Sequence, residues 1–185
     1  MKNKLRIIGG DWRSRQLNFV DAPGLRPTPA RVRETVFNWL RYEISGKQCL
    51  DLYSGSGALG FEAASRGAKL VVQVENNIQA CRSLKDNIVA LSATQIKTVQ
   101  SDVLRYLAGD AQVFDVVFLD PPFGLSLVIQ TCQLLEQNAW LAKHAKIYVE
   151  TERHFDFFGM PENWRLLKSK SAGEVGYHLF ERAEV

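Results

Sequence analysis

Cysteine is scarce in this 185-residue chain, and the arrangement of its few cysteines argues against two common kinds of site. Cys49, Cys81 and Cys132 are odd in number and widely spaced, and no Cys-x-x-Cys occurs. Disulfide frameworks and structural zinc sites use paired or closely spaced cysteines. Because these three residues lie in apolar or helical patterns, we expect reduced, buried thiols and no bound metal.

Long apolar runs are also lacking. The first apolar segment, residues 5–8, is too short for the core of a signal peptide or for a membrane span. We therefore expect a cytoplasmic protein with no membrane association. With 46% hydrophobic and 23% charged residues, the chain has the composition of one well-buried domain. We expect residues 1–185 to form a single domain that acts as a monomer.

A net charge of +3 conceals an uneven distribution of charge. Residues 1–50 hold ten Lys and Arg against four Asp and Glu, whereas the remainder holds thirteen against sixteen. This division, +6 against −3, indicates a polyanion-binding surface beside a nearly neutral body, although a solvated charged face is the alternative. Arginines among glycines and prolines favour nucleic acid as the polyanion. The nucleic-acid-binding candidates are Arg6, Arg13, Arg15, Arg26, Thr28, Arg31 and Arg33.

The first 45 residues predict a small hairpin followed by a helix. Two short strands are expected at residues 4–8 and 15–20, around a turn at Gly9-Gly10-Asp11. Thr28 is the expected N-cap of the helix, with Pro29 in its first turn, and apolar residues recur at helical spacing to about Tyr42. We expect residues 1–45 to be a basic RNA-binding extension and residues 46–185 to be the catalytic body.

From Gln48 onward, strand-like and helix-like segments alternate. Short apolar runs end at Asp51, Glu75, Asp102 and Asp120, and helices are expected near residues 58–66, 77–91, 103–108 and 126–137. A fifth strand at residues 146–150 precedes an antiparallel hairpin at residues 164–171 and 176–181. This order predicts an α/β fold whose mostly parallel sheet has helices on both faces. The four acidic residues should then meet at the carboxyl edge of the sheet, where ligands bind.

Residues 51–60 indicate a cofactor site within this edge. Gly55, Gly57 and Gly60 would let the backbone approach a ligand, and the amides of the helix that follows favour an anionic group. Glu75, 20 residues after Gly55, is placed to accept hydrogen bonds from ribose hydroxyls. Asp102 could accept from the amino group of an adenine. Together these residues predict a pocket for adenosine.

Two cofactors, a dinucleotide and S-adenosylmethionine, would place adenosine there. A dinucleotide needs a second mononucleotide half and usually a substrate domain, for which the roughly 65 residues after Asp120 leave no room. Asp51 could also accept from the ammonium group of S-adenosylmethionine, which a dinucleotide lacks. We predict S-adenosylmethionine. The cofactor-binding candidates are Asp51, Tyr53, Ser54, Gly55, Ser56, Gly57, Gly60, Glu75, Asn76, Asp102 and Val103.

Asp120-Pro121-Pro122-Phe123 is the candidate catalytic loop. Two prolines fix φ and remove two backbone donors, which leaves carbonyl oxygens and the Asp120 carboxylate as acceptors. Such a loop can hold an amino group, and Phe123 offers a face on which a base held outside its helix can stack. The alternative is an ordinary turn after a strand.

Two motifs resemble those of known methyltransferases. Residues 51–60 resemble the first motif of class I S-adenosylmethionine-dependent methyltransferases, and residues 120–123 resemble the Asp/Asn-Pro-Pro-aromatic motif of enzymes that methylate amino nitrogens. With residues 7–10 and 25–40, the resemblance is closer to the bacterial 16S ribosomal RNA guanine-N2-methyltransferases and covers nearly the whole chain. It implies a Rossmann-like seven-stranded fold, with the N-terminal hairpin as an extension.

For function, this resemblance implies methylation of a guanine exocyclic amine in small-subunit RNA. Because a segment of +6 charge releases few counterions, we expect the RNA to be bound within a small-subunit particle. Two other readings stay open. The chain could methylate another amino nitrogen, such as adenine N6 or a protein glutamine. It could also be a non-catalytic RNA-binding factor in ribosome assembly.

Overall fold

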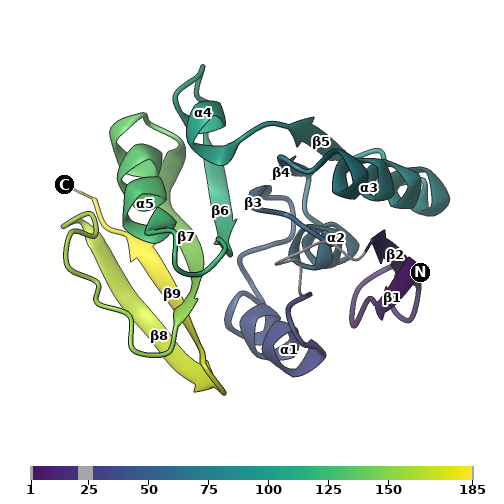
Figure 1. Cartoon of the computed structure of the whole chain (residues 1–185), viewed down its shortest axis with the longest axis horizontal. Coiled ribbons are helices and arrows are strands. Elements are labelled where there is room, and N and C mark those ends of the chain that lie inside the picture. Colours follow the sequence, from purple (N-terminus) through teal and green to yellow (C-terminus); the bar gives the residue numbers. More distant parts are fainter. Residues whose placement is uncertain (1, 21–26, 185) are drawn as a thin grey trace.

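A computed structural model describes residues 2–20 and 27–184 of the chain (Figure 1). Its main sheet has seven strands in the order β5-β4-β3-β6-β7-β9-β8. The strands β3 to β7 pair in parallel, and β9 and β8 close the sheet in antiparallel pairing. Their bounds are Gln48–Leu52 (β3), Leu70–Glu75 (β4), Ile96–Gln100 (β5), Phe114–Leu119 (β6), Leu141–Glu152 (β7), Trp164–Ala172 (β8) and Val175–Arg182 (β9). The predicted mostly parallel, seven-stranded α/β fold is confirmed.

Helices cover both faces of this sheet, as Figure 1 shows. On one face are α1 (Ala30–Trp39), α2 (Ala58–Ser65) and α3 (Ile78–Leu91); on the other are α4 (Val103–Leu107) and α5 (Leu127–Gln137). Successive strand residues alternate between the two cores, since Val116 and Phe118 join the first and Val117 and Leu119 the second. Burial on both faces explains the nearly continuous apolar sequence of β6.

A separate antiparallel hairpin of β1 (Lys2–Arg6) and β2 (Gln16–Val20) lies beside α2 and α3. Its apolar residues Leu5, Leu17 and Phe19 extend the first core. The Asn87 side chain on α3 completes the attachment: it accepts from the Asn18 backbone amide at 3.0 Å and donates to the Asn18 carbonyl at 2.8 Å. The predicted N-terminal hairpin is thus confirmed, with the first strand two residues earlier than expected.

Two local predictions are wrong because tertiary contacts override the local pattern. The N-cap of α1 is Pro29, and no side chain caps this helix; Thr28 instead donates to Glu150 at 3.2 Å. The fifth strand of the main sheet, β7, begins at Leu141 instead of at residue 146. Its pairing with β6 shifts register after Phe114, and His144 has φ 57°, so an irregularity interrupts the alternation that the sequence analysis relied on.

All three cysteines are free and buried, as predicted. Within residues 2–20 and 27–184, no helix is long and apolar enough to cross a membrane. The same residues contain no cluster of three or more His, Cys, Asp or Glu side chains that could hold a metal ion.

Candidate active site at the carboxyl edge of the sheet

The loop between β3 and α2 forms the centre of this edge. Tyr53, Gly55 and Gly57 all have positive φ, at 58°, 52° and 77°. Gly57 is the N-cap of α2, and a Cβ there would lie 2.5 Å from a methyl group of Leu84. The loop therefore needs glycine at residue 57 both for its left-handed backbone and for the close approach of α3.

Gly60, inside α2, is required for a different reason from the one that the sequence suggested. A Cβ at this position would lie 2.7 Å from Asp51 Oδ2 and 2.6 Å from Gln73 Nε2. Its backbone amide donates to Asp51 Oδ2 at 3.0 Å. The missing side chain thus lets α2 pack against β3 and β4, and it does not open space for a ligand.

Asp51 is buried inside β3, with 2% of its surface exposed, whereas the sequence predicts it at the open edge. Burial raises its pKa to about 8, and the hydrogen bond from the Gly60 amide only partly opposes this. Ser54 is also buried and donates to the Asp51 carbonyl at 2.6 Å. In this structure both residues support the loop from beneath. This corrects the expectation that Asp51 stands open to an ammonium group.

Glu75 lies at the end of β4 and joins this loop to α3. Its Oε2 accepts from the Gly55 amide and its Oε1 from the Asn77 amide, both at 2.8 Å. Asn77, which the sequence analysis did not single out, is the N-cap of α3. A carboxylate has about four acceptor positions, so Glu75 can still accept from a hydroxyl. Asn76 beside it is exposed.

Asp102 follows β5 as an exposed residue and caps α4, accepting from the Arg105 amide at 2.9 Å. Val103 is buried in the second core and Ser56 is buried in the glycine loop, so both shape the site. Glu75 and Asp102 leave carboxylate acceptors at the ends of two adjacent strands. These carboxylates can accept hydrogen bonds from the ribose hydroxyls and the amino groups of S-adenosylmethionine.

The Asp120 loop follows β6. Because β6 pairs with β3 on the side opposite β4, this loop and Glu75 flank the glycine loop. Asp120 is partly exposed, Pro121 is buried, and Pro122 and Phe123 are exposed. The Phe123 ring, 43% exposed, borders a cavity of about 110 Å³. The lining residues of this cavity are Pro122, Phe123, Gly124, Ser126, Leu127, Val128, Glu152 and Phe155. The loop thus presents an acceptor and an open aromatic face next to a hollow.

A second carboxyl group, that of Glu150, lies next to Asp120 on the neighbouring strand. Leu119 on β6 pairs with Val149 on β7, so Asp120 and Glu150 follow on neighbouring strands. Glu150 is buried and accepts from the Tyr148 hydroxyl at 2.8 Å. Burial and the Glu150 charge raise the pKa of Asp120 well above its usual range, and burial also raises the pKa of Glu150. The sequence leaves the role of Glu150 open, although its place at the end of a strand was a usable signal.

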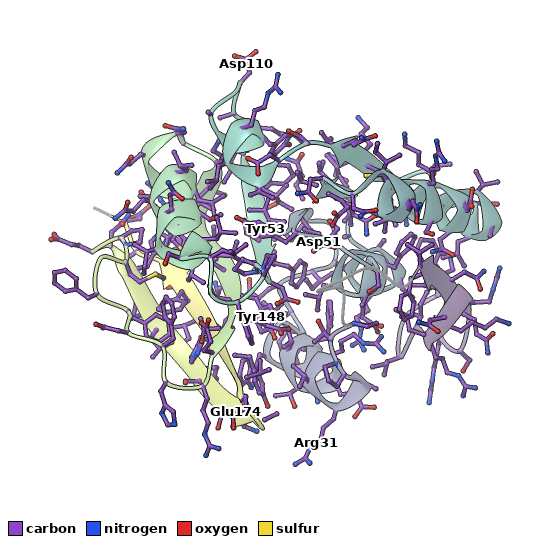
Figure 2. The ribbon with its side chains drawn as sticks, viewed as in Figure 1. Arg31, Asp51, Tyr53, Asp110, Tyr148 and Glu174 are labelled. Carbon is purple, nitrogen blue, oxygen red and sulfur yellow. The ribbon has the colours of Figure 1, made fainter. Side chains whose placement is uncertain are left out.

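Figure 2 shows how the labelled side chains of this region lie. Asp51, Tyr53 and Tyr148 are near the centre of the molecule, whereas Arg31 projects outward from α1. The Tyr53 hydroxyl is 2.8 Å from Thr131 Oγ1 on α5, so Tyr53 ties the glycine loop to the second face of the sheet. Tyr53 therefore has a structural partner in addition to its expected place near the cofactor.

Two of the RNA-binding candidates are turned inward. Arg33 is 4% exposed and donates to the Thr28 carbonyl at 3.1 Å and to the Arg6 carbonyl at 3.0 Å. Its Nη1 lies 3.4 Å from Oε2 of Glu62, which is fully buried. Thr28 is buried too. Arg33 and Thr28 therefore hold the N-terminal segment to the body, and neither is exposed as the prediction of RNA binding requires.

The remaining candidates form a different group. Arg6, Arg13, Arg15 and Arg31 are exposed, and Arg15 also donates to the Ala90 carbonyl at 3.2 Å. Arg26 lies outside the described residues. Four arginines of the extension are thus accessible to an external polyanion.

Comparison with known proteins adds to this geometry. Residues 5–181 match the family model described as Conserved hypothetical protein 95. The Ribosomal RNA small subunit methyltransferase D of Escherichia coli (strain K12) is 46% identical over 179 residues, which cover 97% of this chain and 90% of that protein. The protein of the same description from Haemophilus influenzae is 46% identical over 184 residues, covering 97% and 95%. A solved structure described as a putative methyltransferase from Escherichia coli superposes with a TM-score of 0.89 at 45% identity and covers 98% of this chain and 99% of its own.

Proposed function

Because this chain belongs to the family described as Conserved hypothetical protein 95, whose members include small-subunit ribosomal RNA methyltransferases, we propose that it methylates the exocyclic N2 amine of a guanine in 16S ribosomal RNA. The observation that carries this proposal is the Asp120 loop. It places a partly exposed carboxyl group beside an open aromatic ring at the carboxyl edge of a class I methyltransferase sheet.

S-Adenosylmethionine is the cofactor, and it supplies a methyl group that its sulfonium already activates. Glu75 accepts from the ribose hydroxyls, and Asp102 accepts from the adenine amino group. The amides of the glycine loop, together with the start of α2, favour the carboxylate of the amino-acid portion. Beneath them, Asp51 and Gly60 hold α2 in place.

Asp120 acts on the amine. The lone pair of guanine N2 is delocalised into the ring, so N2 is a poor nucleophile. Asp120 and the Pro121 carbonyl accept its hydrogens, direct the lone pair towards the methyl group and stabilise the positive charge that develops on nitrogen. Loss of a proton follows methyl transfer, when the nitrogen is far more acidic, so positioning precedes base catalysis. Phe123 stacks on the guanine.

The N-terminal extension, residues 1–45, provides the RNA-binding surface, and residues 46–185 bind the cofactor and the base. Exposed Arg6, Arg13, Arg15 and Arg31 contact phosphates, which orient the RNA without reading its sequence. A segment of +6 charge releases few counterions, so tight binding requires an assembled small-subunit particle that presents several phosphates together. The protein acts as a monomer in the cytoplasm.

Two alternatives share part of this evidence. An Asp-Pro-Pro-aromatic loop recognises an amino group more surely than the molecule that carries it, so adenine N6 or a protein glutamine could be the acceptor. A non-catalytic assembly factor would use the basic extension without methyl transfer. The Asp120–Glu150 pair favours an enzyme over this last reading, since carboxyl groups with strongly raised pKa values at the ligand-binding edge of a sheet are typical of active sites.

Asp120→Ala tests the proposal, with the exposed Asp110→Ala as the matched control. Loss of the amine acceptor should lower single-turnover methylation by about 100-fold or more, while affinity for S-adenosylmethionine and for the RNA particle is retained. Asp110→Ala should match the wild type. Undiminished methylation by Asp120→Ala would contradict the proposed function.

A further inference from the structure

The Asp120 carboxyl group is backed by Glu150. On the parallel strands β6 and β7 the register pairs Leu119 with Val149, so the next residues, Asp120 and Glu150, are neighbours at the carboxyl edge. Asp120 is partly exposed, whereas Glu150 is 5% exposed and therefore lies farther from solvent. As neighbours on paired strands, the two carboxyl groups act on each other's ionisation. A hydrogen bond between two carboxyl groups requires a proton on one of them, because two carboxylates offer only acceptors.

The other partners of Glu150 are donors. The hydroxyls of Tyr148 and Thr28 lie 2.8 Å and 3.2 Å from the same oxygen, Oε1. Two donors on this oxygen favour the negative charge on Glu150 and leave the shared proton on Asp120. Thr28 belongs to the N-terminal extension, and its carbonyl is held by Arg33 at 3.1 Å. Through this residue the extension reaches the group directly behind the catalytic carboxyl.

We propose that Glu150 is a positioning residue for methyl transfer, which shares one proton with Asp120 and keeps a single negative charge behind the amine. This inference rests on the proposed function. After N2 has received the methyl group it carries one proton too many. The N–H bond then breaks, and an Asp120 oxygen takes that proton while the shared proton moves to Glu150. The pair passes from one proton to two and from charge −1 to neutral, and releases the extra proton to water when the product leaves.

A pair of carboxyl groups titrates differently from one group. The shared proton makes the first ionisation easier, and the charge that results makes the second harder. Burial raises the pKa values of both Asp120 and Glu150, and each acts on the other. The other groups that face the pair are Asp51 on β3, which acts on Asp120 when it is ionised, Tyr148 on β7, and Tyr177, which is opposite Glu150 on β9. From the extension, Thr28 faces it, and Arg33 holds Thr28 from behind.

The test is the pH dependence of single-turnover methylation by Glu150→Gln, Thr28→Val and Tyr148→Phe. Each change removes either the partner of the pair or a donor that stabilises its charge, so the first ionisation should move to higher pH. At pH values below the first ionisation, the rate relative to that at about pH 8 should fall about tenfold for each pH unit of this shift. Affinity for S-adenosylmethionine should be unchanged, because the residues assigned to its adenosine are Glu75 and Asp102, not the carboxyl pair.

Two variants serve as controls for this measurement. Thr35→Val removes a hydroxyl of α1 that donates only to the Arg31 carbonyl, and Glu174→Gln removes an exposed carboxylate at the turn between β8 and β9. Both should keep the wild-type pH profile. If the three test variants melt at lower temperature but keep the wild-type profile, Glu150 has only a structural role and the inference is wrong.

The outcome also separates this inference from the proposed function. If the wild type forms N2-methylguanosine and Asp120→Ala does not, the proposed function stands whatever the profiles of the Glu150 network show. If the wild type transfers no label to RNA, the proposed function itself fails. The inference is supported if the wild type is active and the three variants lose methylation rate at higher pH than the wild type does as the pH is lowered.

Discussion

Among residues 2–20 and 27–184, four carboxyl groups are buried, and each is held differently. Glu62 accepts from two arginines and two backbone amides, and Glu75 accepts from two amides. Glu150 accepts from the hydroxyls of Tyr148 and Thr28. Asp51 has the Gly60 amide as its main opposing donor, and its pKa is raised to about 8. At neutral pH, Asp51 is therefore mostly protonated, unlike a surface aspartate.

Asp51→Asn should change how stability depends on pH. The folded-state pKa of Asp51, about 8, is above its ordinary value of 3.8. The contribution of this proton is therefore complete below about pH 4 and is lost as pH rises to about 8, because the folded state binds the proton more tightly than the unfolded state does. Urea unfolding at several pH values should show the wild type losing about 3 to 5 kcal/mol more than the variant across this range.

Asp110→Asn, at an exposed position, is the control for that measurement and should keep the wild-type slope. Equal slopes for the wild type and Asp51→Asn would show that Asp51 is ionised in the folded protein. In that case its carboxylate would be available to an ammonium group, as the sequence suggested.

At the scale of elements, the extension and α2 are joined by one buried network. Glu62 on α2 accepts from the amides of Ile8 and Gly9 at 3.0 and 2.8 Å. The same carboxylate forms ion pairs with two arginines. Its Oε2 lies 3.4 Å from Arg33 Nη1, and its Oε1 lies 2.9 Å from Arg66 Nε. Because Glu62 is fully buried, this network fixes the turn after β1 against the helix that begins at the cofactor loop.

Glu62→Gln should release this attachment. It removes the charge that balances the buried Arg33, and breaking a buried ion pair costs about 3 to 5 kcal/mol. Denaturant unfolding should show this loss, and hydrogen exchange should accelerate at the Ile8 and Gly9 amides. Asp86→Asn, at an exposed position of α3, is the control and should change neither. Unaltered exchange at these two amides would contradict the role given to Glu62.

The sequence predicted most elements because the local signals and the fold agree. Buried strands such as β6 are apolar runs that end at a polar residue, so the order of the strands and the acidic ends of β4 and β6 were found. Thr28 and Arg33 were misassigned because their partners are far away in sequence. Glu150 is 122 residues from Thr28, and Glu62 is 29 residues from Arg33. The residues around Arg33 do not indicate that its partner is a buried carboxylate.

At the scale of the whole molecule, we propose that two regions of opposite charge bind different ligands. Exposed Arg6, Arg13, Arg15 and Arg31 lie in the extension, whereas the acidic residues Glu75, Asp102 and Asp120 lie at the edge of the sheet. Under the proposed function, RNA phosphates contact these arginines, and the cofactor donates hydrogen bonds to the acidic edge.

Replacing Arg13, Arg15 and Arg31 by Ala should weaken RNA binding through charge alone. Each phosphate contact on a single strand contributes about 0.7 to the slope of log affinity against log salt, so the slope should fall by about 2. Affinity for particles measured at several salt concentrations gives this value. Arg165→Ala, exposed on β8 beside Glu181, is the control and should leave the slope unchanged. A triple variant with the wild-type slope would place the RNA elsewhere.

The central claim is that this protein transfers a methyl group to a guanine amine in small-subunit RNA. The most direct test is transfer of labelled methyl from S-adenosylmethionine to small-subunit particles from cells that lack this protein, followed by nucleoside analysis of the RNA. We expect the label in N2-methylguanosine. Label in another nucleoside or in protein would contradict the guanine acceptor, and no transfer by a protein that binds S-adenosylmethionine would contradict the enzymatic function.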